Sequence, residues 1–559
     1  MDPLSIARAL REVSQYLQLK GEDFYKSRAY DFGADRMAGF SGDLGALVRE
    51  GRLTELHRTG SLQLLEQLRA EFPPGILELL RLPDLGAKKA AALHKALRVG
   101  SIEQLEQACR DQRVRGLKGF GERSEQKILG GIEQYRSAHA RRRLGDVLPV
   151  AQALLSEVRA APGVVRAELA GSVRRWCELV SDVDIVASAP EAGPVLAVLA
   201  RQSGVSEVLG QGDSKCSVRM EDGLQVDLRV LPDEDYATAL HHFTGSKAHH
   251  VRLRGRARDL GLTISEWGVL RGEEKQPVPT EEALYSLLGM SYVPPELRED
   301  MGEFEAALAG TLPADLLQAS AVQGVVHSHS TWSDGKSSLE AMARAAAALG
   351  LRYLTVTDHS AAAAYAGGLD ETRVRSQWEE IARVQEAVPQ LRLFKGLEVD
   401  ILEDGALDLS DRLLAELDVV IASVHIRHGQ DEAAMTARVL KALDHPCTDV
   451  LGHPTGRLLQ KRDPSPLNMP AVVERAAKRG VLLEVNGNPD RLDLSAEHVR
   501  LALQAGARLV VSADAHSTLA LHNVAFAIHT ARKGGARTSD VLNTRGPDEF
   551  LAEIRRRRG

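Results

Sequence analysis

Short apolar runs recur through the C-terminal half of the chain, and stretches with helical periodicity separate them. The seven runs are Val325-Val326, Leu354 to Val356, Leu393 to Leu397, Val419 to Val424, Val450-Leu451, Val481 to Val485 and Leu509 to Val511. Buried strands that alternate with helices are typical of a parallel sheet or barrel. The pattern therefore predicts an α/β sheet or barrel for this half of the chain.

Almost every one of these runs is followed by a side chain that can bind a metal ion. The nine candidates are His327, His329, Asp334, His359, Glu398, His425, His453, Asp514 and His516. Because the C-terminal ends of parallel strands meet at one mouth, we expect these side chains to converge. Imidazole with carboxylate suits zinc, manganese or iron better than calcium, and nine ligands exceed what one ion needs. A cluster of two or three ions would turn water into hydroxide and favour phosphoester cleavage.

Two runs in the middle of the chain alternate apolar and polar residues, as half-buried strands do. Ser181 to Val186 places Asp182 and Asp184 on one face, and Leu224 to Val230 carries Asp227. We expect Asp227 to approach the other two from a neighbouring strand. Three such carboxylates repel one another unless divalent cations bridge them, so the pattern predicts a site for Mg²⁺ or Mn²⁺. Two ions there would activate an attacking hydroxyl and neutralise a leaving pyrophosphate.

The segment before these strands has the composition of a phosphate-binding turn. Gly171 and Ser172 follow an apolar stretch, and Arg175 comes shortly after them. Glycine lets the backbone approach a phosphate closely, and arginine pairs with phosphate oxygens. We predict that these three residues hold a nucleotide triphosphate.

A pattern near the N-terminus occurs twice, as Leu82-Pro-Asp-Leu-Gly86-Ala-Lys88-Lys89 and as Leu117-Lys-Gly119-Phe-Gly121-Glu-Arg123. Each copy reads as a helix, a short turn with glycine at the same offset, and a new helix with basic residues. The N-terminus of the second helix offers free amides to a phosphate. The pattern resembles the helix-hairpin-helix motif, which contacts the DNA backbone without reading bases. The predicted DNA contacts are Gly86, Lys88, Lys89, Gly119, Gly121 and Arg123.

An ordinary glycine cap of a helix is the alternative for either copy of this pattern. A third, weaker copy is predicted at Leu56 to Gly60.

Composition and charge agree with a chain of several domains, since 559 residues are enough for three or four. The net charge is −7, but the segment from Leu82 to Arg143 has fourteen Lys/Arg against seven Asp/Glu. A binding partner interacts with the local charge of this segment, and a positively charged segment suits phosphate binding. Four scattered cysteines without a close pair fit a reduced cytoplasm. The N-terminus reads as an amphipathic helix rather than a signal peptide, and no apolar run is long enough to span a bilayer.

The metal-ligand motifs occur in an order that resembles the PHP (polymerase and histidinol phosphatase) family. The matching segments are His327-Ser-His329-Ser-Thr-Trp-Ser-Asp334, Thr357-Asp-His359-Ser, Gly396-Leu-Glu398, Ser423-Val-His425, Gly452-His453-Pro-Thr-Gly-Arg and Ser512-Ala-Asp514-Ala-His516. The resemblance implies a distorted seven-stranded α/β barrel with a trinuclear metal site. All nine ligand positions of the family are filled here, which implies a working site.

The middle of the chain resembles the nucleotidyltransferase palm of family X DNA polymerases. The resemblance continues into the nucleotide-binding subdomain, where it assigns nucleotide contacts to Phe243, Gly245, His250 and Arg254. Three positions depart from the family pattern. Ser181 stands where the family has glycine, His242 where it has tyrosine, and His250 where it has asparagine. The resemblance therefore implies a polymerase without implying the usual discrimination between sugars.

Together the motifs predict a multidomain chain. Residues 1–140 form a helical DNA-binding region with helix-hairpin-helix motifs, and residues 141–233 an α+β nucleotidyltransferase palm. Residues 234–317 form the nucleotide-binding subdomain and linker, and residues 318–559 the α/β PHP barrel. The last basic run, Arg555 to Arg558, is predicted to be a solvated tail.

The resemblance implies a DNA-directed DNA polymerase that fills short gaps in base excision repair. The barrel is expected to add a metal-dependent 3′–5′ exonuclease, an abasic endonuclease or a 3′ phosphatase. Expected cofactors are Mg²⁺ or Mn²⁺ at the palm and two or three Mn²⁺, Zn²⁺ or Fe ions at the barrel. Expected partners are gapped or primer-template DNA and deoxynucleoside triphosphates, without a membrane. The predicted form is a cytoplasmic monomer.

Two alternatives remain at this point. One is a DNA-structure-binding nuclease with an impaired palm, which the intact Asp182, Asp184 and Asp227 disfavour. The other is a PHP phosphatase of small phosphate esters, which the hairpins and the local positive charge disfavour.

Overall fold

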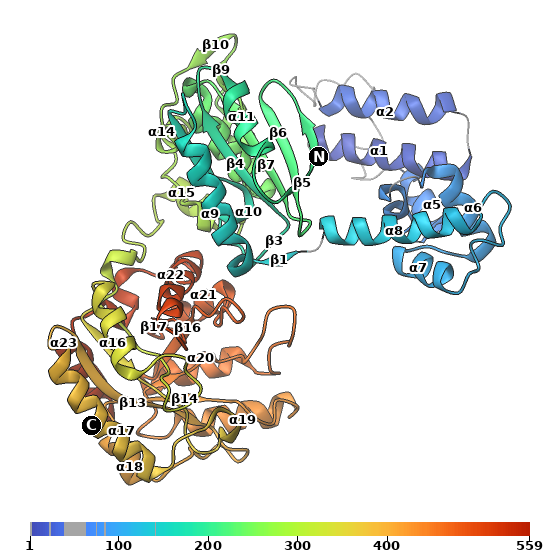
Figure 1. Cartoon of the computed structure of the whole chain (residues 1–559). Coiled ribbons are helices and arrows are strands. Elements are labelled where there is room, and N and C mark those ends of the chain that lie inside the picture. Colours follow the sequence, from blue (N-terminus) through green and yellow to red (C-terminus); the bar gives the residue numbers. More distant parts are fainter. Residues whose placement is uncertain (1–2, 22–23, 39–62, 74, 83–84, 140) are drawn as a thin grey trace. The chain divides into compact units, whose positions relative to one another are not determined.

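The computed structural model of the chain describes residues 3–21, 24–38, 63–73, 75–82, 85–139 and 141–559. It separates into two compact units, residues 1–140 and residues 141–559, and each is described by itself (Figure 1). Within the described ranges, no helix has the length and apolar character needed to cross a membrane.

The N-terminal unit consists of helices around a small apolar core. They are α1 (Pro3–Lys20), α2 (Phe24–Ala38), α5 (Gln63–Glu71), the 3-10 helix η1 (Ile76–Arg81), α6 (Ala87–Leu97), α7 (Ile102–Arg110) and α8 (Glu122–His139). The predicted amphipathic N-terminal helix is α1, which buries Val13, Tyr16 and Leu17 at helical spacing. The proposed third hairpin copy at Leu56 to Gly60 lies outside the described residues.

The second unit begins with a five-stranded sheet in the order β2-β4-β7-β6-β5. These strands are β2 (Arg166–Leu169), β4 (Asp182–Ser188), β5 (Val205–Gln211), β6 (Lys215–Met220) and β7 (Gln225–Leu231). β4 and β7 are neighbours, as expected for the strand that carries Asp227, and they pair in parallel. Helices α9 (Leu144–Ala160) and α11 (Ala192–Ala200) form the apolar core together with Val183 and Ile185 of β4. The opposite side chains of β4 are therefore left for the site.

A smaller subdomain, the thumb, follows the sheet. It contains α12 (Tyr236–Thr244), α13 (Lys247–Asp259), β8 (Leu262–Ser265), β9 (Gly268–Arg271), β10 (Glu274–Gln276), α14 (Glu281–Leu287), η3 (Pro295–Leu297) and α15 (Glu303–Ala309). Buried Arg298 donates a 2.6 Å hydrogen bond to Glu281, and Arg174 of the palm donates another of 2.6 Å. This network fixes the thumb on the palm, because a buried carboxylate needs both partners.

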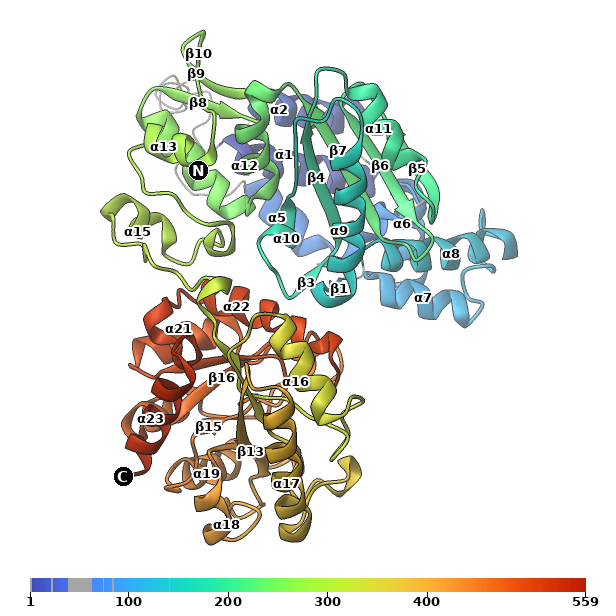
Figure 2. The same cartoon turned by 60° about the vertical axis from the view of Figure 1, so that its left-hand side comes forward.

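The C-terminal region is a nearly closed barrel of seven parallel strands in sequence order, β11 to β17 (Figure 2). The strands are β11 (Gly324–Val325), β12 (Tyr353–Val356), β13 (Arg392–Asp400), β14 (Val419–Ser423), β15 (Val450–Leu451), β16 (Leu482–Asn486) and β17 (Leu509–Ser512). A parallel bridge between Ser328 and Ala515 links the chain just beyond β11 and β17. All seven predicted strands are confirmed, because each apolar run is buried between neighbours that are themselves buried.

Helices surround this barrel on the outside. They are α16 (Leu339–Ala348), α17 (Glu371–Ala387), α18 (Asp411–Glu416), α19 (Glu432–Leu443), α20 (Met469–Arg479), α21 (Ala496–Gln504), α22 (Val524–Lys533) and α23 (Pro547–Arg558). The barrel contacts the palm through Arg457, which donates hydrogen bonds of 2.5 and 3.2 Å to Glu178. His529 of α22 also stacks on Trp176 of the palm at a ring distance of 3.7 Å.

The prediction of a solvated C-terminal tail is wrong. Arg555 to Arg558 belong to α23, and Arg557 and Arg558 form ion pairs with Asp449, whose side chain is buried. Only Arg555 and Arg556 are exposed. The run of arginines in the sequence could not reveal these ion pairs, because their partner Asp449 lies far away in the sequence.

Replacing Arg557 and Arg558 together by alanine is expected to destabilise the barrel by about 3 kcal/mol, because Asp449 keeps a buried charge without its partners. The midpoint of the barrel's thermal transition in calorimetry measures this. The double replacement of exposed Arg555 and Arg556 is the matched control and should leave the midpoint nearly unchanged. If both double variants lowered the midpoint equally, the ion pairs with Asp449 would not be what stabilises the barrel.

Candidate active sites in the palm and the barrel

The palm carboxylates lie on two neighbouring strands. Asp182 and Asp184 project from β4 away from the core, and Asp227 of β7 is the register partner of Asp184. Lys215 of β6 donates a 3.1 Å hydrogen bond to Asp227, and Gln225 donates another of 3.3 Å. Among the described residues, groups with ligand atoms within 4.8 Å of one another occur only in the barrel. The fold thus gathers the palm carboxylates on one face, while Asp227 turns toward Lys215.

The charges of these carboxylates are poorly compensated by the protein. Burial, Asp182 and Asp227 together raise the pKa of Asp184 to about 7. Burial and Asp227 also raise the pKa of Asp182, against the opposing effects of Arg175 and Lys215. A divalent cation would restore the ionised forms, so this donor set fits Mg²⁺ or Mn²⁺.

The predicted phosphate-binding turn lies against these carboxylates. Gly171 begins the short helix α10 (Gly171–Arg174) with φ +59°, and a Cβ at this position would overlap the Asp184 carboxylate. Both the backbone angle and the lack of space require glycine here. Ser172 lies on α10, half-buried, and Arg175 directly follows. Arg175 donates from Nη1 to the carbonyl oxygen of Thr244, so its side chain reaches from the palm to the thumb.

The predicted nucleotide contacts of the thumb lie on α12, on α13 and at their junction. The Arg229 guanidinium lies 4.3 Å from the centre of the Phe243 ring, and Gly245 ends α12 with φ +69°. His250 and Arg254 share α13. Burial lowers the pKa of His250 to about 3, with smaller contributions from His242 and Arg254. The imidazole of His250 is therefore neutral near pH 7, and within the described chain its two ring nitrogens lack hydrogen-bond partners.

In the barrel, the predicted ligands gather around one buried carboxylate, that of Glu398. Its Oε2 lies 3.3 Å from His327, 3.5 Å from His329 and 3.0 Å from His359. Its Oε1 lies 2.8 Å from His453 and 3.2 Å from His425. These six side chains lie on or just after five strands, β11 to β15, so the convergence that the motifs predicted is present.

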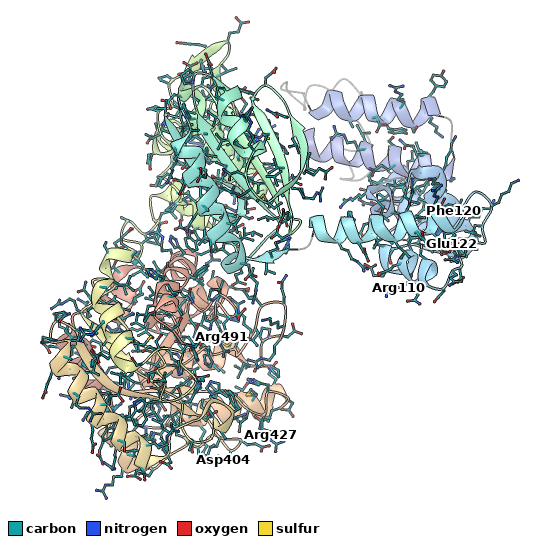
Figure 3. The ribbon with its side chains drawn as sticks, in the orientation of Figure 1. Arg110, Phe120, Glu122, Asp404, Arg427 and Arg491 are labelled. Atoms are coloured by element: carbon teal, nitrogen blue, oxygen red, sulfur yellow. The ribbon has the colours of Figure 1, made fainter. Side chains whose placement is uncertain are left out.

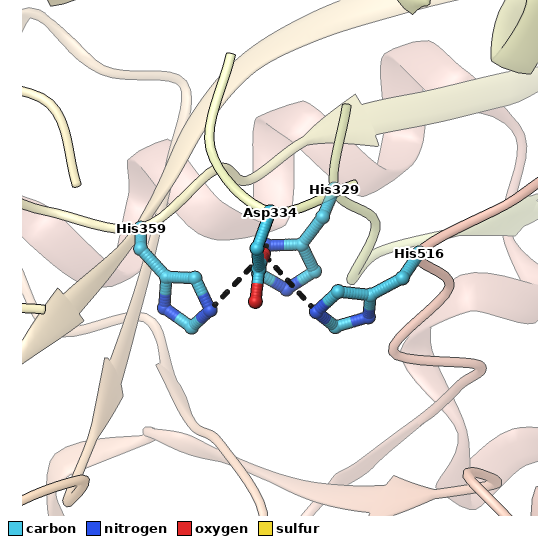
Figure 4. A group of neighbouring side chains, drawn as sticks. All are labelled: His329, Asp334, His359 and His516. Atoms are coloured by element: carbon cyan, nitrogen blue, oxygen red, sulfur yellow. Dashed lines mark ion pairs between the residues drawn. The ribbon is translucent and has the colours of Figure 1, made fainter. Parts of the chain in front are cut away.

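The remaining three predicted ligands extend this cluster on one side. Asp334 lies 3.6 Å from His359 and 3.3 Å from His516, and His329 completes that group (Figure 4). Asp514 lies 3.2 Å from His329 and 3.6 Å from His327. In the described chain, three overlapping groups have ligand atoms within 4.8 Å: His329, Asp334, His359 and His516; His327, His329 and Asp514; and His359, Glu398 and His425. Because His329 and His359 each belong to two groups, the groups can hold neighbouring ions.

Unpaired buried atoms show that the barrel residues fit metal ions. Ring nitrogens of His327, His329, His359 and His425 and Oε2 of Glu398 are buried without hydrogen-bond partners in the described chain. Such atoms are rare in folded proteins unless something binds them. His453 and Asp514 also have left-handed backbone, with φ +24° and +48°, a strain that is common at functional sites. Nitrogen and oxygen donors in this ratio suit Zn²⁺, Mn²⁺ or Fe²⁺.

Several residues that support the predicted metal ligands were not identified from the sequence. Glu484 accepts a 2.7 Å hydrogen bond from Nδ1 of His327, and Asp400 one of 3.2 Å from Nδ1 of His425. Such bonds orient a ligating imidazole and fix its tautomer. Nε of Arg491, which Figure 3 labels, lies 3.4 Å from Oδ2 of Asp514, whereas His327 and His329 lie near Oδ1. A carboxylate inside an apolar strand, as at Glu484, is the signal that could have revealed the first of these.

The helices that follow Gly86 and Gly121 begin in the same way. The carbonyl of Gly86 accepts amide hydrogen bonds from the residues three and four positions later, and the carbonyl of Gly121 does the same (Figure 3 labels its neighbours). Both glycines are exposed helix starts with open space where a Cβ would stand. Neither has positive φ; Gly119 does, with φ +90°. The exposed Lys88, Lys89 and Arg123 lie on the helices that follow.

Comparison with known families and proteins agrees with this organisation. Family models match residues 76–133 as a SAM-like helix-hairpin-helix tandem, residues 239–299 as a DNA polymerase beta thumb and residues 326–486 as a PHP domain. The DNA polymerase/3′-5′ exonuclease PolX of Bacillus subtilis (strain 168) is 36% identical over 571 aligned positions, which cover 100% of both chains. The chain belongs to the PolX family. The predicted resemblance to family X DNA polymerases with a PHP domain is thereby confirmed.

Two other matches cover only parts of this chain. A probable phosphatase of Thermoanaerobacter sp. (strain X514) is 27% identical over 250 positions, 42% of this chain and 96% of that protein. A ternary complex structure of Leishmania infantum polymerase beta covers 40% of this chain and 97% of that chain, with 21% identity and a TM-score of 0.31. That score is too low to support a structural argument.

Replacing Gly86 or Gly121 by glutamine is expected to weaken binding of gapped DNA about equally for different sequences. A Cβ at either position has no protein atom within 4 Å, and the side chain would extend from it over the first helical turn, where a phosphate would lie. Mobility-shift titrations measure the loss. Gly130→Gln, at an exposed glycine with equally open surroundings inside α8, is the matched control. Unchanged binding by both hairpin variants would favour ordinary helix caps.

Proposed function

We propose that this PolX chain fills short gaps in DNA during repair and trims 3′ ends. The palm adds deoxynucleotides to a 3′ hydroxyl, and the barrel hydrolyses phosphodiesters in the 3′–5′ direction. The observation that supports this most strongly is the full-length correspondence with a protein named for both activities. The two ligand sets stand on different sheets, which supports two separate active sites.

In the palm, each predicted residue has a role that its position supports. Cations bound by Asp182, Asp184 and Asp227 would activate the 3′ hydroxyl and neutralise the leaving pyrophosphate. Arg175 and the Gly171–Ser172 turn orient the triphosphate beside them. Phe243 and Gly245 shape the nucleotide pocket, and Arg254 lies on the same helix as His250.

His250 takes the place of an asparagine that contacts the incoming nucleotide in the family. As a neutral imidazole it can donate one hydrogen bond and accept another, much as an amide does. We therefore propose that His250 contacts the nucleotide without adding charge.

In the barrel, Glu398, Asp334 and Asp514 would supply the negative charge, and the six histidines would supply nitrogen donors, which bind a metal ion in their neutral form. Bound Mn²⁺, Zn²⁺ or Fe ions would generate the attacking hydroxide and polarise the phosphate. Glu484 and Asp400 hold His327 and His425 in the orientation that leaves the other ring nitrogen for an ion. The three overlapping ligand groups favour two or three ions over one.

The hairpins bind the DNA, because their exposed helix starts and basic residues suit contacts with backbone phosphates, whatever the DNA sequence. We propose gapped or primer-template DNA and deoxynucleoside triphosphates as partners. We also propose a monomer in the cytoplasm; the four cysteines are unpaired, which suits a reducing compartment.

A phosphatase of small esters is the second candidate, because a probable phosphatase matches 42% of this chain over 96% of its own length. A match of that extent leaves more than half of the chain without a role, so we favour the polymerase and nuclease. A gapped, 5′-end-labelled duplex tests the choice. With Mg²⁺ or Mn²⁺ and deoxynucleotides the primer should lengthen, and without nucleotides it should shorten. A protein that only releases phosphate from small esters would overturn the proposal.

A further inference from the structure

A lysine of the barrel reaches the predicted triphosphate-binding arginine of the palm. Lys533 ends α22, on the side of the barrel that faces the palm and thumb (Figures 1 and 2). Its Nζ donates to Oε1 of Glu299 at 2.6 Å and to the carbonyl oxygen of Arg175 at 3.1 Å. The same Oε1 accepts a hydrogen bond from Nε of Arg175 at 3.1 Å. One carboxylate oxygen is therefore shared by two cations from different domains.

This cluster is mostly shielded from water. The side chains of Arg175, Glu299 and Lys533 are 14%, 26% and 16% exposed. The thiol of Cys177 donates to the shared oxygen of Glu299 at 3.2 Å. Burial raises the pKa of Glu299, but Lys533 and Arg175 outweigh it and lower the pKa overall, so the carboxylate is ionised. Two cations and one carboxylate leave one net positive charge.

The position of that charge relates it to the nucleotide site. A Cβ on Gly245 would lie 3.3 Å from Nη1 of Arg175, so the guanidinium lies at the predicted nucleotide pocket. Without Lys533, Glu299 would neutralise Arg175, and a neutral pair attracts a triphosphate less than a free cation does.

We propose that Lys533 is a positioning residue of the polymerase site, which balances Glu299 so that the cluster around Arg175 keeps a net positive charge for the triphosphate. This inference rests on the proposed polymerase function. It makes the barrel a structural part of the nucleotide site, in addition to carrying its own metal cluster.

Lys533→Met should raise the KM for deoxynucleotides about tenfold and change kcat little, because it removes one charge near the triphosphate. The Kd of a fluorescent deoxynucleotide in the complex with gapped DNA should rise by about the same factor. Lys533→Arg should stay close to the parental values. Adding Glu299→Gln to Lys533→Met should restore KM, because the carboxylate that needed balancing is gone.

Arg532→Met is the matched control. Arg532 is the neighbour of Lys533 on α22 and also pairs across the interface, with Glu296 at 2.7 Å, without touching Arg175. It should leave KM nearly unchanged. Equal effects of Arg532→Met and Lys533→Met, or no recovery in the double variant, would overturn the role of charge. An unchanged KM in Lys533→Met overturns the inference and leaves the polymerase intact, whereas a parental chain that extends no primer overturns the proposed function itself.

Discussion

Replacing Glu398 by alanine is expected to reduce metal-dependent DNA cleavage by at least about a thousandfold, on the order of 4 kcal/mol of activation free energy. Glu398 contacts five of the predicted histidine ligands within 3.5 Å, so its loss affects every part of the cluster. Primer extension should continue, because no predicted palm residue contacts this carboxylate in the described chain. Cleavage of a labelled duplex and metal content per chain measure the two effects.

The matched control is Glu403→Ala, at an exposed carboxylate on the loop after β13. It should cleave DNA and bind metal as the parental chain does. If Glu398→Ala cleaves DNA at the parental rate with its full metal content, the nuclease site lies elsewhere.

Replacing Asp227 by alanine is expected to reduce nucleotide addition by at least about a thousandfold and to leave cleavage intact. Asp227 stands in register with Asp184. Burial and the neighbouring carboxylates raise the pKa of Asp184 to about 7, and a bound cation would offset this effect. Without Asp227, a cation held by Asp182 and Asp184 would lose the predicted ligand on β7. Single-nucleotide incorporation into a gapped duplex, at saturating Mg²⁺, measures the change.

Asp213→Ala serves as the control for this variant, since Asp213 is exposed in the turn between β5 and β6 of the same sheet. It should incorporate nucleotides normally. If Asp227→Ala incorporates nucleotides at the parental rate, Asp227 is not part of the polymerase site.

The convergence of the candidate barrel residues could be predicted because most of them follow an apolar run. In a parallel barrel, the position after a strand determines where a side chain lies, so His327, Glu398 and Asp514 could be brought together without coordinates. The relation of Asp182, Asp184 and Asp227 followed in the same way from strand alternation. Local pattern and site geometry coincide in both cases.

Contacts between distant segments could not be predicted. Arg558 looked like part of a solvated tail because nothing nearby in the sequence reveals its partner Asp449. Lys215 beside Asp227 and Lys533 beside Glu299 likewise depend on how strands and domains pack. Glu484 lies within an apolar run. A charged residue there is stable only if it has a buried partner, and the partner of Glu484 is His327.

We propose that one chain carries two active sites with separate ligand sets. The two sites are distinguished by comparing Asp227→Ala, Glu398→Ala and their equimolar mixture on one gapped, end-labelled duplex, with and without deoxynucleotides. We expect that Asp227→Ala only shortens the primer, that Glu398→Ala only lengthens it, and that the mixture does both. Loss of both activities in either single variant would contradict this proposal.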